Sequence, residues 1–186
     1  MGEKQMNNSE IEKATASILK AIGDDPERSS VKETPKRVAK AFNEIFAHTN
    51  DQQFNDFKLF DIDDDDQTVV VRNIPFYSMC EHHLLPFFGT VDVAYVPNNG
   101  KIIGLSKIPR LVDFVAKRPN VQENMTSMLI TEMNRILNPK GVAVKITARH
   151  MCMEMRGINK QGEETTTTKF QGIFKSDSIM RSEFLN

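Results

Sequence analysis

Long hydrophobic runs are missing from this 186-residue chain, and no stretch approaches the ~18 consecutive apolar residues that a membrane-spanning helix needs. Residues 1–10 also lack the apolar core of a signal peptide. Cysteine is scarce, and two residues cannot form the disulfide framework of a small secreted domain. We therefore expect a cytoplasmic protein in which the cysteines react, bind a metal or are simply buried.

The chain also has little net charge, −1 at neutral pH. This value argues against a protein that holds nucleic acid by general electrostatics. The balance hides an asymmetry, because residues 1–66 have 9 Lys and Arg against 15 Asp and Glu, whereas residues 67–186 have 15 against 10. The C-terminal two-thirds is therefore the part expected to attract an anion.

Residues 1–66 are expected to form a helical N-terminal appendage that ends in an acidic linker. Apolar residues recur at helical spacing over residues 11–22 and again over residues 34–46, where Thr34 and Pro35 form a typical helix start. Residues 61–66 hold five Asp in six positions but lack the Gly and the distal Glu of an EF-hand loop. We interpret this acidic run as a solvated linker.

The remaining residues, 67–186, are predicted to form an α+β unit of the order β-β-α-α-β-β. Period-two patterns indicate strands, and two longer stretches have helical spacing. The strands are expected at residues 69–71, 87–96, 102–103, 141–156 and 165–174, and the helices at residues 106–117 and 121–137.

The strand predicted over residues 141–156 changes character along one face. Alternate residues are apolar from Val142 to Ala148, and the same face then continues with reactive side chains: His150, Cys152, Glu154 and Arg156. A second cluster at residues 78–83 contains Cys80, His82 and His83. A buried cysteine or a lone histidine is usually structural, but together the clusters contain both cysteines and three of the four histidines. They indicate a common site.

Cys80 and His83 have the C-x-x-H spacing of half a zinc site, and Cys152 would supply a third ligand. In an extended segment, His82 and His83 would point in opposite directions, which leaves one of them for proton transfer. A closed structural site needs a fourth protein ligand, for which His150 is the candidate. We favour the alternative, a catalytic site with three ligands and an open position.

The region between the two clusters has features of an anion-binding site. Residues 104–107 lead into the helix predicted at 106–117, whose N-terminal N–H groups favour a phosphate, and Lys107 and Arg110 lie one turn apart. Each cation alone is ordinarily a surface charge. Glu123, near the start of the next helix, is placed where a helix favours a carboxylate in any case.

Four motifs make the chain similar to a known family. They are Ser78-Met-Cys-Glu-His-His-Leu-Leu-Pro-Phe87, Ile103-Gly-Leu-Ser-Lys107, Val121-Gln-Glu123 and Ala148-Arg-His-Met-Cys-Met-Glu-Met-Arg-Gly157. Their content and order resemble GTP cyclohydrolase I of the zinc-dependent type, and the resemblance runs from about Asp25 to the C-terminus.

This resemblance implies specific roles for the residues of the two clusters and of the region between them. The zinc ligands would be Cys80, His83 and Cys152, and the catalytic histidines His82 and His150. Gln122 and Glu123 would hold the guanine base, while the triphosphate would be held by Lys40, Ser106, Lys107, Arg110 and Arg156.

The resemblance also implies an assembly and a reaction. Residues 67–186 would be a catalytic domain of the tunnelling fold, a four-stranded antiparallel sheet with two helices on one face. Strands of neighbouring subunits would join into a barrel, and ten chains would form a homodecamer with active sites at subunit interfaces. The implied reaction opens the imidazole ring of GTP by hydrolysis, releases formate and gives 7,8-dihydroneopterin triphosphate, the first step of folate and pterin biosynthesis.

Three places depart from the family pattern: Asp92 stands where histidine is usual, Pro109 interrupts a stretch usually free of proline, and residues 118–120 precede the guanine motif.

Two other functions compete with this interpretation. A tunnelling-fold relative such as a nitrile reductase would use a catalytic cysteine without zinc, and the two cysteines with a His-His pair count against it. The second competing function is that of a non-enzymatic module with a structural zinc.

Overall fold

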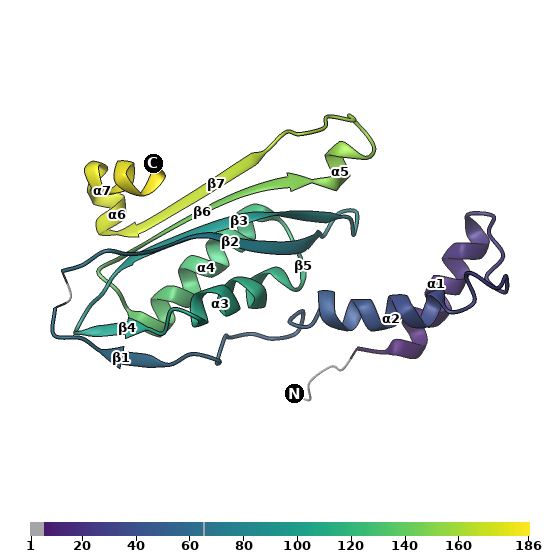
Figure 1. Cartoon of the computed structure of the whole chain (residues 1–186), viewed down its shortest axis with the longest axis horizontal. Helices are drawn as coiled ribbons and strands as arrows, with labels where there is room; N and C mark the ends of the chain where they lie inside the picture. The colour runs from purple at the N-terminus through teal and green to yellow at the C-terminus, as the bar shows by residue number, and fades with distance from the viewer. Residues whose placement is uncertain (1–5, 65) are drawn as a thin grey trace. The chain divides into compact units, whose positions relative to one another are not determined.

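The computed structural model describes residues 6–64 and 66–186 (Figure 1). The described residues up to Asn50 form one compact unit, and Asp51–Asn186 form a second. The sequence predicted a division at residue 66 instead. The difference arises because β1 (Leu59–Asp61) pairs antiparallel with β4 (Lys101–Ile103), which ties the end of the predicted appendage to the second unit. Within the described ranges, no helix combines the length and apolar character needed to cross a membrane.

The N-terminal unit consists of two helices, α1 (Asn8–Ala21) and α2 (Thr34–Ile45). The Asn7 side chain caps α1 by accepting a hydrogen bond from the backbone N–H of Glu10 at 3.2 Å. Pro35 lies in the first turn of α2, where its missing N–H costs nothing. Both helices predicted from the sequence are thus confirmed.

The second unit is built on a five-stranded sheet of order β5-β2-β3-β6-β7. Its four long strands are antiparallel: β2 (Val69–Cys80), β3 (Pro86–Val96), β6 (Gly141–His150) and β7 (Thr165–Gly172). The fifth, β5 (Pro119–Asn120), pairs in parallel with the last two residues of β2. The α+β class is therefore confirmed. The sheet has five strands where the resemblance implies four, because β5 is added beside β2.

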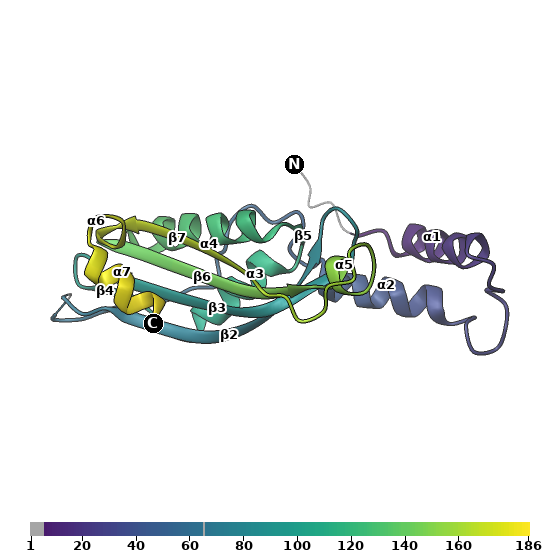
Figure 2. The same ribbon diagram turned by 90° about the horizontal axis from the view of Figure 1, so that it is seen from above.

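Two helices, α3 (Lys107–Ala116) and α4 (Gln122–Leu137), cover one face of this sheet (Figure 2). The main core lies between the helices and the sheet, and alternate residues of β6 such as Val142, Val144 and Ile146 are fully buried in it. Two short helices, α6 (Ile173–Ser176) and α7 (Ser178–Leu185), pack on the opposite face through Phe174 and Phe184. The period-two pattern of the sequence therefore predicted the buried face of β6 correctly.

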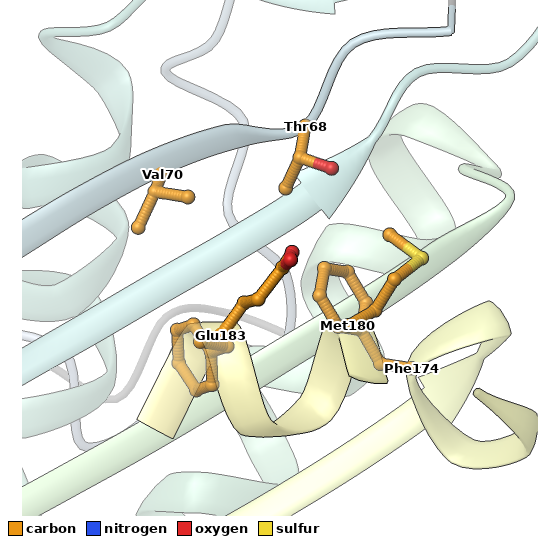
Figure 3. Close-up of a pocket in the computed structure, with 6 residues that line it drawn as sticks. Thr68, Val70, Phe174, Met180 and Glu183 are labelled. Carbon is orange, nitrogen blue, oxygen red and sulfur yellow. The ribbon is translucent and has the colours of Figure 1, made fainter. Parts of the chain in front are cut away.

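The helix α7 was not expected from the sequence. Asp177 starts it by accepting hydrogen bonds from the backbone N–H groups of Ile179 and Met180, at 2.8 and 3.1 Å. Beside it lies a cavity of about 140 Å³, lined in part by Val70 and Glu183 (Figure 3). Val70 lies next to the first residue of β2, and Cys80 is the last residue of that strand, so this cavity lies roughly 30 Å away from the reactive cluster.

Two of the departures from the family pattern have structural explanations. Asp92 Oδ1 accepts a hydrogen bond from the backbone N–H of Asn73 at 2.7 Å. Asn73 has a positive φ of 56° and lies in the β-bulge between Val71 and Ile74, so Asp92 stabilises this irregular part of β2. Pro109 lies in the first turn of α3, where proline is tolerated.

Candidate metal and active site

A tight turn after β2 carries the first two predicted metal ligands. The backbone N–H of Cys80 donates to the carbonyl of Leu85 at 2.9 Å, and the carbonyl of Cys80 accepts from Leu84 N–H at 2.9 Å. The intervening residues are therefore not extended, and the premise that His82 and His83 point in opposite directions is wrong. Each of the two histidines places its Nδ1 atom 3.9 Å from Cys80 Sγ.

The third predicted ligand, Cys152, lies on the helical turn α5 (Met151–Glu154). The strand predicted over residues 141–156 is thus wrong beyond His150, where β6 ends. The turn is held by the buried Glu154, whose two carboxylate oxygens accept from Arg149 Nε at 2.8 Å and Nη2 at 2.5 Å. Because His150 pairs with Phe87 on β3, α5 begins close to the start of that strand and to the turn that precedes it.

The turn and α5 together form a group of three ligand atoms that could hold a metal ion. The ligand atoms of Cys80, His83 and Cys152 all lie within 4.8 Å of one another. A tetrahedral zinc site separates its sulfur and nitrogen ligands by roughly 3.5–3.8 Å, so small side-chain adjustments suffice. Burial raises the pKa of the Cys152 thiol above its ordinary value of 9.0, and the adjacent Cys80 raises it further. A cation is the partner that two adjacent sulfurs need in order to ionise, so the donor set fits zinc.

His150 lies beside this group but is engaged elsewhere. Its Nε2 atom is 2.8 Å from Oε1 of Gln122. The Gln122 amide nitrogen donates to the carbonyls of Ile146 and Thr165, at 3.1 and 2.9 Å, and lies 3.2 Å from Thr167 Oγ1. Two acceptor-only carbonyls fix the orientation of the amide, so Oε1 faces the histidine and Nε2 must carry the proton. His150 is therefore held in one tautomer, with Nδ1 as its acceptor atom.

The surroundings of His150 favour its neutral form. Its ring stacks on Phe87 with the centroids 4.9 Å apart and the planes inclined by 3°. Burial lowers the pKa of His150 below its ordinary value of 6.5, and the Glu123 carboxylate opposes part of that shift. Glu123 is exposed in the first turn of α4, so the structure brings the predicted guanine-binding carboxylate within electrostatic range of a predicted catalytic histidine.

The predicted phosphate-binding residues fall into separate groups. Lys107 and Arg110 lie in the first turn of α3, directly after the exposed Ser106, and both are paired with Asp56. Arg156 is exposed beyond α5, and its charge acts on Cys152. Lys40 is exposed on α2, in the N-terminal unit.

Comparison with known proteins assigns the chain to a family. A family profile described as GTP cyclohydrolase I matches residues 11–186. The chain is 60% identical over 180 residues to GTP cyclohydrolase 1 of Latilactobacillus sakei subsp. sakei (strain 23K), which covers 96% of this chain and 95% of that protein. The chain belongs to the GTP cyclohydrolase I family. A second relative in the family, GTP cyclohydrolase 1 of Lactiplantibacillus plantarum (strain ATCC BAA-793 / NCIMB 8826 / WCFS1), is 52% identical over 97% of this chain and 96% of its own length.

A solved structure gives a further comparison. The apo form of the archaeosine synthase QueF-Like is matched over 56% of this chain and 93% of that chain, with 19% sequence identity and a TM-score of 0.45. The family assignment depends on the profile and on the relatives of 60% and 52% identity.

Three residues with well-defined contacts near the site were missed or left without a role. Asp56, Arg149 and Glu154 contact predicted site residues or fix the turn that carries one of them. The sequence offers a signal for Glu154, because this carboxylate lies five residues after Arg149 and two residues after Cys152. Asp56 is 51 positions from Lys107, and no local pattern in the GTP cyclohydrolase I motifs signals that contact.

Proposed function

We propose that this chain is a GTP cyclohydrolase I that opens the guanine imidazole ring of GTP by hydrolysis. It releases C8 as formate, and rearrangement of the ribose followed by ring closure gives 7,8-dihydroneopterin triphosphate, the first step of pterin and folate biosynthesis. One observation beyond the family assignment carries the proposal. A three-ligand group of Cys80, His83 and Cys152 adjoins a histidine in a defined tautomer.

Zinc would be held by Cys80, His83 and Cys152. When bound, it lowers the pKa of a water molecule from ~15.7 toward ~7, which provides a nucleophile at neutral pH. Three protein ligands leave a tetrahedral ion one open position, as a catalytic site requires. His150 is not part of the group of ligand atoms, which consists of Cys80, His83 and Cys152.

His82 and His150 would move protons. His150, neutral and with Nδ1 as its acceptor, takes the proton of the attacking water. His82 is exposed in the same turn as His83 and is not one of the three grouped ligands. It is placed to donate to a guanine ring nitrogen, which makes C8 more electrophilic.

Guanine recognition would depend on the start of α4. The ionised Glu123 carboxylate offers two acceptor oxygens, which match the adjacent N1–H and 2-amino donors of guanine. The Gln122 side chain is 2% exposed and fully engaged, so its share in binding guanine comes through the orientation of His150 and through the backbone N–H donors at the helix start.

The triphosphate is not transformed, so its cationic partners act by positioning the substrate. Ser106, Lys107 and Arg110 at the start of α3 form one group of contacts, and Arg156 beyond α5 is another. Lys40 is the fifth residue that the family resemblance assigns to the triphosphate. The five proposed phosphate contacts have polar or cationic side chains. Each is exposed or partly exposed, as contact with a charged ligand requires.

The assembly proposed is a tunnelling-fold homodecamer with active sites at subunit interfaces, in the reducing cytoplasm. In the described sheet, β7 is an outer strand, and β2 is paired along its outer edge only at Met79 and Cys80. Two long strand edges are thus available to neighbouring chains, and closure into a barrel would satisfy them.

The test is to incubate purified, zinc-loaded protein with GTP and to measure pterin fluorescence and formate. Formate and pterin should form in equal amounts. A nitrile reductase or a module with a structural zinc would produce neither, so the absence of both products from folded, zinc-loaded protein would refute the proposal.

A further inference from the structure

Asp56 is brought to the start of α3 by the pairing of two short strands. In this ladder Leu59 lies opposite Ile103, and the backbone N–H of Gly104 donates to the carbonyl of Lys58 at 3.0 Å. The chains run antiparallel, so residues just before β1 lie beside residues just after β4. Asp56 therefore lies next to Lys107, although 51 positions separate them.

The Asp56 carboxylate is shared between two cations. Lys107 Nζ donates to Oδ1, and Arg110 Nη1 donates to Oδ2 at 2.6 Å. These hydrogen bonds, from Lys107 first and Arg110 second, hold the pKa of Asp56 below its ordinary value of 3.8. Asp56 is therefore a permanent anion at physiological pH, and both of its oxygens are directed at the two residues proposed to hold phosphate.

The backbone near Asp56 is anchored. Two residues earlier, Phe54 is buried, its N–H donates to Glu132 Oε2 at 3.0 Å, and its carbonyl accepts from Arg135 Nη2 at 2.5 Å. One residue later, Phe57 packs against the main core. The carboxylate consequently stays within reach of Lys107 and Arg110 whether or not another anion is present.

We propose that Asp56 is an internal counter-anion that competes with the substrate triphosphate for Lys107 and Arg110. The inference rests on the proposed function, which assigns these two residues to phosphate. A phosphate oxygen and the Asp56 carboxylate accept from the same N–H donors, and their like charges repel. The reaction product keeps the triphosphate of GTP, so a carboxylate that returns to the cations also assists product release.

The decisive variant is Asp56→Asn, which keeps the size of the side chain and removes its charge. Loss of competition at two partly exposed ion pairs should tighten the binding of inorganic triphosphate by about 3- to 30-fold. KM for GTP should fall by a similar factor, while kcat stays level or decreases because product leaves more slowly. Asp61→Asn is the matched control, because Asp61 pairs with Lys101 in the same β1–β4 ladder.

The measurement is titration calorimetry with inorganic triphosphate at fixed ionic strength, on the unmutated protein, Asp56→Asn, Asp61→Asn and Lys107→Met. Tighter binding in Asp56→Asn alone supports the proposal. Unchanged or weaker binding in that variant overturns it, as would equal tightening in Asp61→Asn, which would indicate a general charge effect. If Lys107→Met binds triphosphate as well as the unmutated protein, the phosphate site lies elsewhere and the inference fails. Pterin formation by the unmutated enzyme would still support the proposed reaction.

Discussion

At the scale of single residues, the best-defined feature is the pair formed by Gln122 and His150. The family resemblance assigns Gln122 to guanine, and this assignment stays a prediction. Its contacts were beyond prediction, because Ile146, Thr165 and Thr167 come together only when β6 and β7 pair beneath α4. The Gln122 amide is buried and its hydrogen bonds are made within the fold, so its main effect is to orient His150.

The metal ligands give the first prediction. Cys80→Ser and Cys152→Ser should each lose zinc and activity together, because each removes one of three ligands. His82→Ala should keep its zinc and lose about 10²–10⁴-fold in turnover, because it removes only a proton-transfer group. Elemental analysis beside steady-state kinetics checks both. Stoichiometric zinc in either serine variant would contradict the ligand assignment.

His150 gives a prediction on pH. Its pKa is lowered below 6.5, mainly by burial, so the neutral form persists as the pH falls through 6.5 and is lost only at lower pH. The acid limb of kcat/KM should therefore lie below 6.5. The free energy of unfolding should depend on pH in the same direction. The unfolded chain binds the proton of His150 at a higher pH than the folded chain, so stability is lost as the pH falls from 6.5 toward the lowered pKa. A basic limb, in which activity is lost as the pH rises, that is absent from His150→Ala would show that His150 works from its protonated form.

Glu123 separates recognition from helix stabilisation. If it binds guanine, Glu123→Ala should lower kcat/KM for GTP by roughly 10²-fold or more, with normal zinc content, because a charged hydrogen-bonding pair is lost. If it only complements the helix dipole, the loss is about 0.3–1 kcal/mol of stability, without a kinetic effect. Kinetics and melting temperature measured on the same zinc-loaded sample distinguish the two roles.

At the scale of elements, the sequence predicted the two N-terminal helices, α3, α4 and the buried face of β6. It failed where β6 ends. Alternation of polar and apolar residues continues from His150 to Arg156, but the bidentate pair between Arg149 and Glu154 closes the chain into a turn instead. The Arg149–Glu154 pair thus stabilises a turn where the period-two pattern predicts a strand, and this turn places Cys152.

This turn supports a prediction on metal affinity. Glu154→Gln replaces the charged acceptor of Arg149 and should loosen α5, which weakens zinc binding by about 10- to 100-fold, as loss of a supporting contact typically does. Glu132→Gln is the matched control, because Glu132 is equally buried, 6% exposed, and pairs with Arg135. Competition with a chelator measures both affinities. Equal zinc affinity in the two variants would show that the Arg149–Glu154 pair does not position Cys152.

At the scale of the whole molecule, the strand edges predict association. We expect a particle of ten chains, ten times the 21.1 kDa chain mass, because β7 and most of β2 present edges that closure into a barrel would pair. Light scattering of the active enzyme measures this mass. A fully active monomer near 21.1 kDa would contradict the prediction, since the proposed active sites need residues from neighbouring subunits.

The pairing of β3 with β6 sets the order in which the site can form during folding. Cys80 and His83 belong to one local turn. Cys152 joins them only after β3 has paired with β6, which places Phe87 opposite His150, a residue far along the chain. Closing such a long loop is entropically unfavourable and typically slow, so a complete ligand group is a late product of folding. An ion that binds only the completed group then stabilises the native state by mass action. For a chain that binds such an ion, the metal supply of the cell is then a determinant of the fraction that stays folded.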